Sequence, residues 1–117
     1  MKTADDVRLA QLRHDHGPHW DIWKVDRYIG PTVWCTKPAG YATAVHEEAS
    51  AEHLSAWLRR VTALQAKGAV LQFGRDGWTV TATATWTSPA GTQASYGPAP
   101  VMEAVDHAEA ALGIQPP

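Results

Sequence analysis

WTVTATATWT, residues 78–87, is the stretch that decides the fold of this chain. Trp, Val, Ala, Ala and Trp occupy the even positions, and threonine occupies every odd position. A strict period of two over ten residues is typical of a β-strand with one buried face. The small and aromatic side chains are therefore predicted to face the core, and the threonines are predicted to face water.

The buried face of this strand is small at its centre, where Val80, Ala82 and Ala84 leave room for another element. A helix is the usual partner for the apolar face of a sheet. The helix predicted over residues 51–66 is the best candidate, because its apolar side chains recur at helical spacing. These side chains are Leu54, Trp57, Leu58, Val61 and Leu64.

The other elements follow from capping residues, hydrophobic periodicity and turn residues. Together they give an α+β fold in the order α-βββ-α-βββ-α, with an antiparallel sheet of about six strands and helices packed on it. Pro98 and Pro100 are predicted to end the last strand. The predicted helices are 4–16, 51–66 and 101–112, and the predicted strands are 19–28, 32–37, 41–46, 69–74, 78–87 and 92–96.

The length of 117 residues predicts a single domain, 1–117, with one hydrophobic core. After the leading helix 4–16, the order of hairpin, turn, strand and helix occurs twice, in units 19–67 and 69–113. The first unit contains WCTKPAG and the second contains WTSPAG, which supports an internal duplication. The alternative is coincidence in a chain rich in proline, alanine and glycine, and the sequence leaves both open.

The charge balance argues against a nucleic-acid-binding protein without excluding one. Ten basic residues stand against twelve acidic ones, and no basic stripe runs along the chain. Binding to a phosphate backbone depends on such clustered cations. If the chain binds nucleic acid, the candidate contacts are Lys24, Arg27, Arg59 and Arg60.

Neither an apolar run of eighteen residues nor a signal-peptide pattern occurs, so the sequence predicts a cytoplasmic protein with no membrane association. The single cysteine, Cys35, cannot form an internal disulfide or a cysteine-based metal cluster within one chain. Its place in a predicted strand beside Trp34 favours a buried, inert thiol over a nucleophile.

Six tryptophans are several times the usual number for this length. At least four are predicted to lie in the core, because Trp57, Trp78 and Trp86 are in phase with apolar neighbours. The predicted strand 19–28 instead has aromatic residues on both faces. Either the leading helix covers its second face, or the strand presents tryptophan to a partner. The predicted partner surface is Trp20, Trp23, Lys24, Arg27 and Tyr28.

A histidine cluster is the strongest candidate for a metal site. His14, His16 and His19 lie within six residues, and imidazole is a common ligand of Zn²⁺ and similar ions. The alternative is structural, because histidines near the end of a helix favour its negative pole. No motif with established ligand spacing is present to decide between them.

Three phrases resemble small actinobacterial, Streptomyces-type, Trp-rich proteins of unknown function: HGPHWDIW at 16–23, TVWC at 32–35 and SAEHL at 50–54. The second half, 78–112, is loosely similar to the SPDY domain of unknown function, without the Ser-Pro-Asp-Tyr signature. These resemblances cover most of the chain, and they imply no activity, cofactor or catalytic residue.

We therefore expect a small cytoplasmic binding module that is not an enzyme and needs no cofactor. Its expected partner is another protein or a second copy of itself. A nucleic-acid-binding accessory protein and a metal-binding protein are the alternatives, and the sequence identifies no catalytic constellation.

Overall fold

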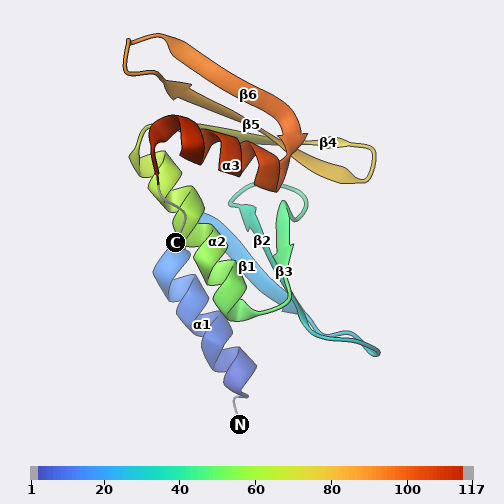
Figure 1. Ribbon diagram of the computed structural model, residues 1–117. Helices are drawn as coiled ribbons and strands as arrows, with labels where there is room; N and C mark the ends of the chain where they lie inside the picture. The colour runs from blue at the N-terminus through green and yellow to red at the C-terminus, as the bar shows by residue number, and fades with distance from the viewer. Residues whose placement is uncertain (1–2, 115–117) are drawn as a thin grey trace. The chain divides into compact units, whose positions relative to one another are not determined.

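The computed structural model describes residues 3–114, and its fold is α+β in the predicted order α-βββ-α-βββ-α (Figure 1). The chain divides into two compact units, residues 1–58 and 59–117, with the boundary inside α2. The elements are α1 (Ala4–His16), β1 (Trp20–Val25), β2 (Val33–Pro38), β3 (His46–Glu48), α2 (Ala51–Ala66), β4 (Val70–Asp76), β5 (Thr79–Thr87), β6 (Gln93–Pro100) and α3 (Val101–Leu112).

The strands form two antiparallel sheets of three, β1-β2-β3 and β4-β5-β6, where the sequence predicts a single sheet of about six. Each sheet is a meander of neighbouring strands, so its pairing needs only short connections. The strand β3 and the strand β4 are separated in sequence by α2 and do not pair in the described residues.

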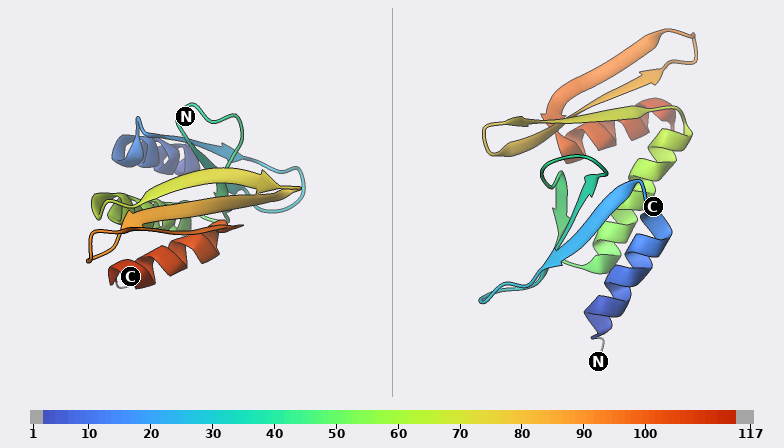
Figure 2. Two further views of the ribbon diagram at one scale, coloured as in Figure 1. Left: turned by 90° about the horizontal axis from the view of Figure 1, so that it is seen from above. Right: turned by 180° about the vertical axis from the view of Figure 1, so that it is seen from behind.

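In the first unit, α1 has the bounds predicted for the leading helix and begins with a capping box. The Thr3 hydroxyl accepts from the Asp6 backbone N–H, and the Asp6 carboxylate accepts from the Thr3 N–H. Arg8 then pairs with Glu52 of α2 at 3.0 Å, and the two helices lie side by side in both views (Figure 2). The buried side chains of this unit include Leu12, Trp20, Ile22, Trp34, Val45, Leu54, Trp57 and Leu58.

The strand β1 ends at Val25, three residues before the predicted end of the strand 19–28. Residues 26–32 form the turn of the β1–β2 hairpin and project away from α1 and α2 (Figures 1 and 2). Gly30 adopts a φ of 108°, a conformation that side chains rarely allow, so the chain turns here rather than continuing the ladder. We refer to residues 26–32 as the arm.

The strand β3 is shorter than predicted and begins further along the chain. It covers His46–Glu48, whereas the sequence predicts a strand over 41–46. Thr36 explains the shift. Its carbonyl accepts from the Val45 N–H, and its Cα lies opposite His46 in the ladder. The residues between Pro38 and Val45 consequently form a loop. The prediction of a strand from Tyr41 is therefore wrong.

In the second unit, the central strand β5 has the predicted orientation. Ala82 and Ala84 are fully buried, Trp86 is buried, and the threonines at both ends of the strand are exposed. The helix that packs on β5 and β6 is α3, through Ala104, Val105 and other buried side chains. Assigning this face to the helix 51–66 was therefore wrong, because α3 follows β6 directly and folds back onto the same sheet.

The strand β6 runs through both prolines to Pro100, although the sequence predicts that they end it. It is an edge strand, and an edge tolerates residues that cannot donate a hydrogen bond on their outer side. The register shifts opposite Ala82 and Ala84, and Gly97 lies in this irregular stretch with a φ of 121°. A Cβ at Gly97 would lie 2.5 Å from the Ala82 carbonyl oxygen, so only glycine fits.

Four tryptophans are buried, as predicted: Trp20, Trp34, Trp57 and Trp86. Trp78 is not among them, since 97% of its surface is exposed. The ladder between β4 and β5 ends where Asp76 pairs with Thr79, and Trp78 lies in the turn between these two residues. No neighbouring strand covers Trp78, although the alternation of β5 would place it on the buried face. Across residues 3–114, every helix is too short or too polar to span a lipid bilayer.

Candidate binding surface

The predicted partner residues Trp23, Lys24, Arg27 and Tyr28 lie on β1 and the arm of the first unit. Arg27 is exposed, and Tyr28 is fully exposed at the tip of the arm. Ile29 beside it is 84% exposed, although the sequence did not single it out. Two adjacent large apolar side chains are therefore exposed to solvent at the end of a hairpin.

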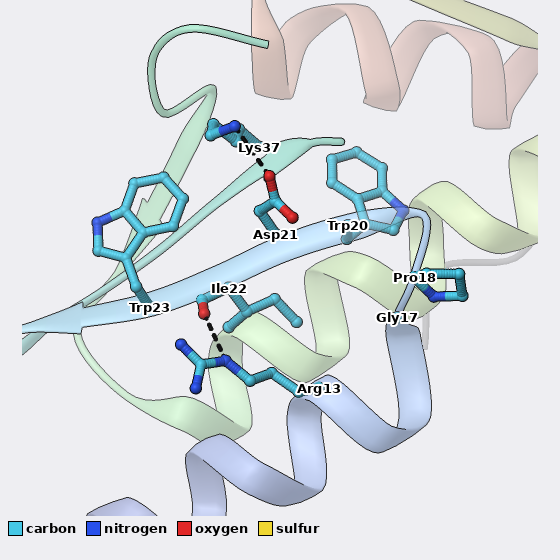
Figure 3. Close-up of a pocket in the computed structure, with 8 residues that line it drawn as sticks. All are labelled: Arg13, Gly17, Pro18, Trp20, Asp21, Ile22, Trp23 and Lys37. Carbon is cyan, nitrogen blue, oxygen red and sulfur yellow. Dashed lines mark hydrogen bonds and ion pairs between the residues drawn. The ribbon is translucent and has the colours of Figure 1, made fainter. Parts of the chain in front are cut away.

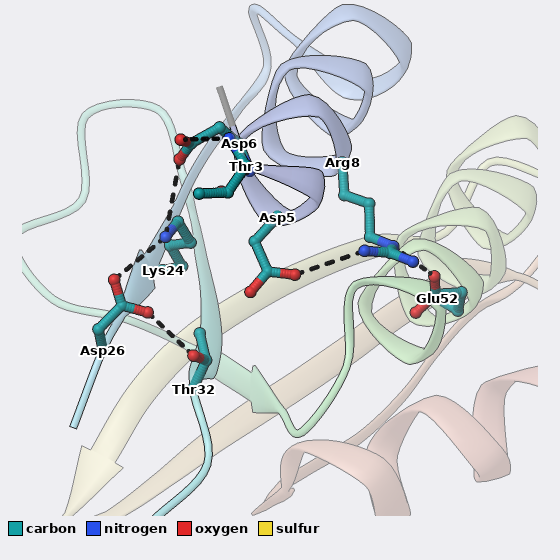
Figure 4. Close-up of polar contacts among 8 residues, drawn as sticks. All are labelled: Thr3, Asp5, Asp6, Arg8, Lys24, Asp26, Thr32 and Glu52. Atoms are coloured by element: carbon teal, nitrogen blue, oxygen red, sulfur yellow. Dashed lines mark hydrogen bonds and ion pairs between the residues drawn. The ribbon is translucent and has the colours of Figure 1, made fainter. Parts of the chain in front are cut away.

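Polar contacts hold the base of the arm (Figure 4). The Lys24 ammonium lies 3.1 Å from Asp26 and 3.7 Å from Asp6 of α1, and the Thr32 hydroxyl donates to Asp26 across the hairpin at 2.9 Å. The Lys24 and Thr32 donors lower the pKa of Asp26. The pKa of Lys24 is raised, chiefly by its hydrogen bond to Asp26. The base is thus fixed by opposite charges while the tip carries the exposed apolar groups.

Trp20 is not part of an exposed surface, and its predicted exposure is wrong. Only 7% of its surface is accessible, and its ring meets the edge of the Trp57 ring with centroids 5.6 Å apart. Trp57 in turn stacks on His46 at 4.2 Å. The first residue of β1 faces α2, so the alternation of β1 places Trp20 and Ile22 inside and Trp23 on the opposite face.

A pocket of about 560 Å³ lies beside β1, between the end of α1 and the start of the sheet (Figure 3). Arg13 reaches from α1 and donates through Nε to the Ile22 carbonyl at 2.9 Å. On the other side of β1, Lys37 pairs with Asp21 at 2.9 Å. The lining residues are Arg13, Gly17, Pro18, Trp20, Asp21, Ile22, Trp23 and Lys37.

The three histidines of the cluster lie in different surroundings. Within residues 3–114, no three His, Cys, Asp or Glu side chains are arranged to hold a metal ion. His14 and His19 are exposed, and the His16 ring lies 3.5 Å from the Ser55 hydroxyl of α2. His14 and His16 are in or near the last turn of α1, where positive charge favours the helix dipole.

The four candidate nucleic-acid contacts are divided between the units, and two of them are engaged by carboxylates. Lys24 contacts Asp6 and Asp26. Arg60 forms a bidentate contact with Glu109 of α3, which is itself buried. Only Arg27 and Arg59 of the four are exposed and free of such ion pairs in the described part of the chain.

Cys35 is a buried thiol, as predicted. Burial raises its pKa, and the nearby Glu47 carboxylate raises it further. A thiol that resists ionisation is a poor nucleophile. The structure therefore favours a buried, inert thiol over a nucleophile at Cys35.

Sequence reasoning missed Arg13 and Ile29. Arg13 is one of three basic residues in the last turn of α1, and no spacing rule indicates that its side chain bonds to β1. For Ile29 a signal was present, because a large aliphatic residue beside the Gly-Pro turn at 30–31 has little chance of burial.

Comparison of the chain with protein-family models, with curated proteins and with solved structures gives no match. The resemblance to actinobacterial Trp-rich proteins and to the SPDY domain therefore stays a prediction.

Proposed function

We propose that this chain is a non-enzymatic protein-binding module, and that the arm of its first unit is the contact surface. Tyr28 and Ile29 are the single observation behind the proposal, because both large side chains stand almost wholly in water at the tip of one hairpin. Adjacent exposed apolar side chains framed by charged ones are typical of interaction sites.

The base of the arm supports the proposal. Asp26 is held from two sides, by Lys24 and by Thr32, so the two sides of the hairpin are joined at the base of the arm. A loop that is held at its base loses less entropy on association than a free one. Tyrosine is also among the residue types that contribute most to protein interfaces.

The partner is another protein or a second copy of the chain, and two measurements separate these cases. Sedimentation velocity of the purified chain detects self-association, and quantitative capture from a lysate of the source organism detects another protein. The test variant is Tyr28→Ser with Ile29→Ser. We expect it to abolish either interaction without loss of structure.

Trp78→Ser is the matched control, because it removes an equally exposed large side chain from a different hairpin, in the second unit. Binding should survive this change. A wild-type chain that is monomeric and captures nothing would contradict the proposal, and so would equal losses in the two variants.

The alternative functions receive no support from a specific contact. Lys24 and Arg60 are occupied by carboxylates, which reduces the positive charge available to a phosphate backbone. The cytoplasmic location and the internal duplication stay predictions. Each unit does contain a three-stranded antiparallel meander followed by a helix or its first half, which agrees with a duplication.

A further inference from the structure

The helix α1 packs on the first unit with little apolar surface. Among residues 4–16, all of which the structure describes, Leu12 alone is buried. The first half of α2, by contrast, buries Leu54, Trp57 and Leu58 almost completely. Helices in folded proteins owe most of their stability to such packing, and an isolated helix of thirteen residues is marginal in water. Of the two helices that pack on this unit, α1 is therefore the one that leaves more easily.

Two polar contacts join α1 to α2, and neither holds it firmly. Arg8 Nε lies 3.0 Å from the Glu52 carboxylate, and both side chains are well exposed. An exposed ion pair adds little stability, and salt screens it. The His16 ring lies 3.5 Å from the Ser55 hydroxyl, which is long for a hydrogen bond.

The contact of α1 with the sheet depends on Arg13. Its Nε donates to the Ile22 carbonyl of β1 at 2.9 Å, and the ribbon of β1 runs past this side of the helix (Figure 3). A hydrogen bond from a charged donor is stronger than one between neutral groups. Arg13 is therefore the residue whose loss should release α1 most readily.

The start of α1 reaches the base of the arm through Lys24 (Figure 4). The Lys24 ammonium lies between two carboxylates, 3.7 Å from Asp6 of α1 and 3.1 Å from Asp26 of the arm. Only 16% of the Lys24 side chain is exposed. If α1 moves away, Lys24 loses Asp6 and gains water, and an ion pair in water is weaker than a shielded one. The contact that holds Asp26 consequently weakens.

We infer that α1 is a releasable strap of the first unit: it opens while the sheet β1-β2-β3 stays folded, and its release loosens the base of the arm. Weakly packed elements open at a lower free energy than the core does. The core that stays closed consists of side chains from the sheet and α2, among them Trp20, Trp34, Leu54, Trp57 and Leu58. The strap regulates the arm, and this regulatory meaning rests on the proposed function, whereas the opening itself does not.

Native-state hydrogen exchange of the full chain, followed by NMR and corrected for intrinsic rates, measures the opening. The amides of residues 8–16 in α1 should exchange at least about tenfold faster than those of residues 54–58 in α2. Raising the NaCl concentration from about 0.05 M to about 0.5 M should accelerate exchange in α1 at least about twofold, because it screens the exposed ion pairs. The same change should leave residues 54–58 unaffected.

Arg13→Met is the test variant, since methionine keeps the apolar stem and removes the donor to Ile22. It should accelerate exchange of residues 8–16 about tenfold or more. The Val25 and Val33 amides, at the arm end of the β1–β2 ladder, should accelerate at least about threefold, because the arm loosens with α1. Unchanged exchange of residues 54–58 shows that the variant is folded. Arg59→Met is the matched control, because it alters an exposed arginine of the second unit, and it should change none of these rates.

Three outcomes would overturn the inference. They are protection of α1 equal to that of residues 54–58, equal acceleration of α1 and α2 in Arg13→Met, and unchanged exchange at Val25 and Val33 in that variant. None of these measurements needs a partner. A helix that opens in a chain whose arm binds nothing would contradict the proposed function alone, and a helix that stays closed in a chain whose arm binds would contradict this inference alone.

Discussion

Glu109 and Arg60 form the contact whose removal should most weaken the second unit. Arg60 Nε lies 3.0 Å from Glu109 Oε2, and Arg60 Nη2 lies 2.6 Å from Oε1. The Glu109 side chain is 5% exposed and the Arg60 side chain 18%. The hydrogen bonds to Glu109 are the largest cause of the raised pKa of Arg60.

Replacing Glu109 with leucine leaves a largely buried guanidinium without its main partner. Breaking a buried ion pair costs about 3–5 kcal/mol. Arg60 also contacts Asp106 at 2.7 Å, and that remaining contact places the expected loss near the lower end, at about 3 kcal/mol. Asp106→Ala is the control. Because that carboxylate is 65% exposed, its removal should cost less than about 1 kcal/mol.

The double variant Arg60→Leu with Glu109→Leu removes both charges and should recover most of the loss, to within about 1 kcal/mol of wild type. The assay is urea unfolding, together with native-state hydrogen exchange of the α3 amides, which reports on this unit alone. A single variant that costs less than about 1 kcal/mol would refute this reasoning. A double variant that is no more stable than Glu109→Leu would refute it as well.

Three further outcomes are expected. Gly97→Ala should destabilise the second unit by at least about 2 kcal/mol in urea unfolding, because its Cβ meets the Ala82 carbonyl at a positive φ; an unchanged midpoint would contradict this. The arm should loosen in acid: the pKa of Asp26 is lowered, so its contact with Lys24 is present above the ordinary value of about 3.9 and is lost as pH falls through the lower folded value. Amide exchange of residues 26–32 at falling pH checks this, and exchange corrected for intrinsic rates that stays constant would count against it. Cys35 should resist iodoacetamide at pH 8 and react in urea, since burial raises its pKa; equal rates would show that the thiol is accessible.

Local signals in the sequence predicted much of the fold. Capping and turn residues predicted α1 at its observed bounds, and the alternation of β5 predicted its inward and outward faces. Both signals depend on neighbours within a few residues. Such short-range patterns survive folding because the same backbone geometry produces them in any context.

The errors came from tertiary contacts. Helix α3 rather than α2 covers β5, because apolar periodicity shows that a helix has a buried face without showing what it packs on. Trp78 has the phase of β5 but lies beyond the ladder, where no strand covers it. The shift of β3 depends on the bond from Val45 to Thr36, which residue types alone do not encode.

The candidate site was predicted in part. Tyr28 and Arg27 are exposed on the arm, as a hairpin turn before Gly-Pro suggests, whereas Trp20 is buried by its contact with Trp57. Arg13 could not be identified from sequence. Its bond to β1 depends on α1 ending beside the free edge of β1, which is a property of the packed unit.

Photo-crosslinking from the tip of the arm tests the central claim most directly. p-Benzoylphenylalanine at position 28, in place of Tyr28, should form one defined adduct, with another protein or with a second copy, when the chain is irradiated in cells of its source organism. The same group at Ala10, which is exposed on α1, is the control and should form no such adduct. An absence of adducts at position 28, or the same adducts at both positions, would contradict the account.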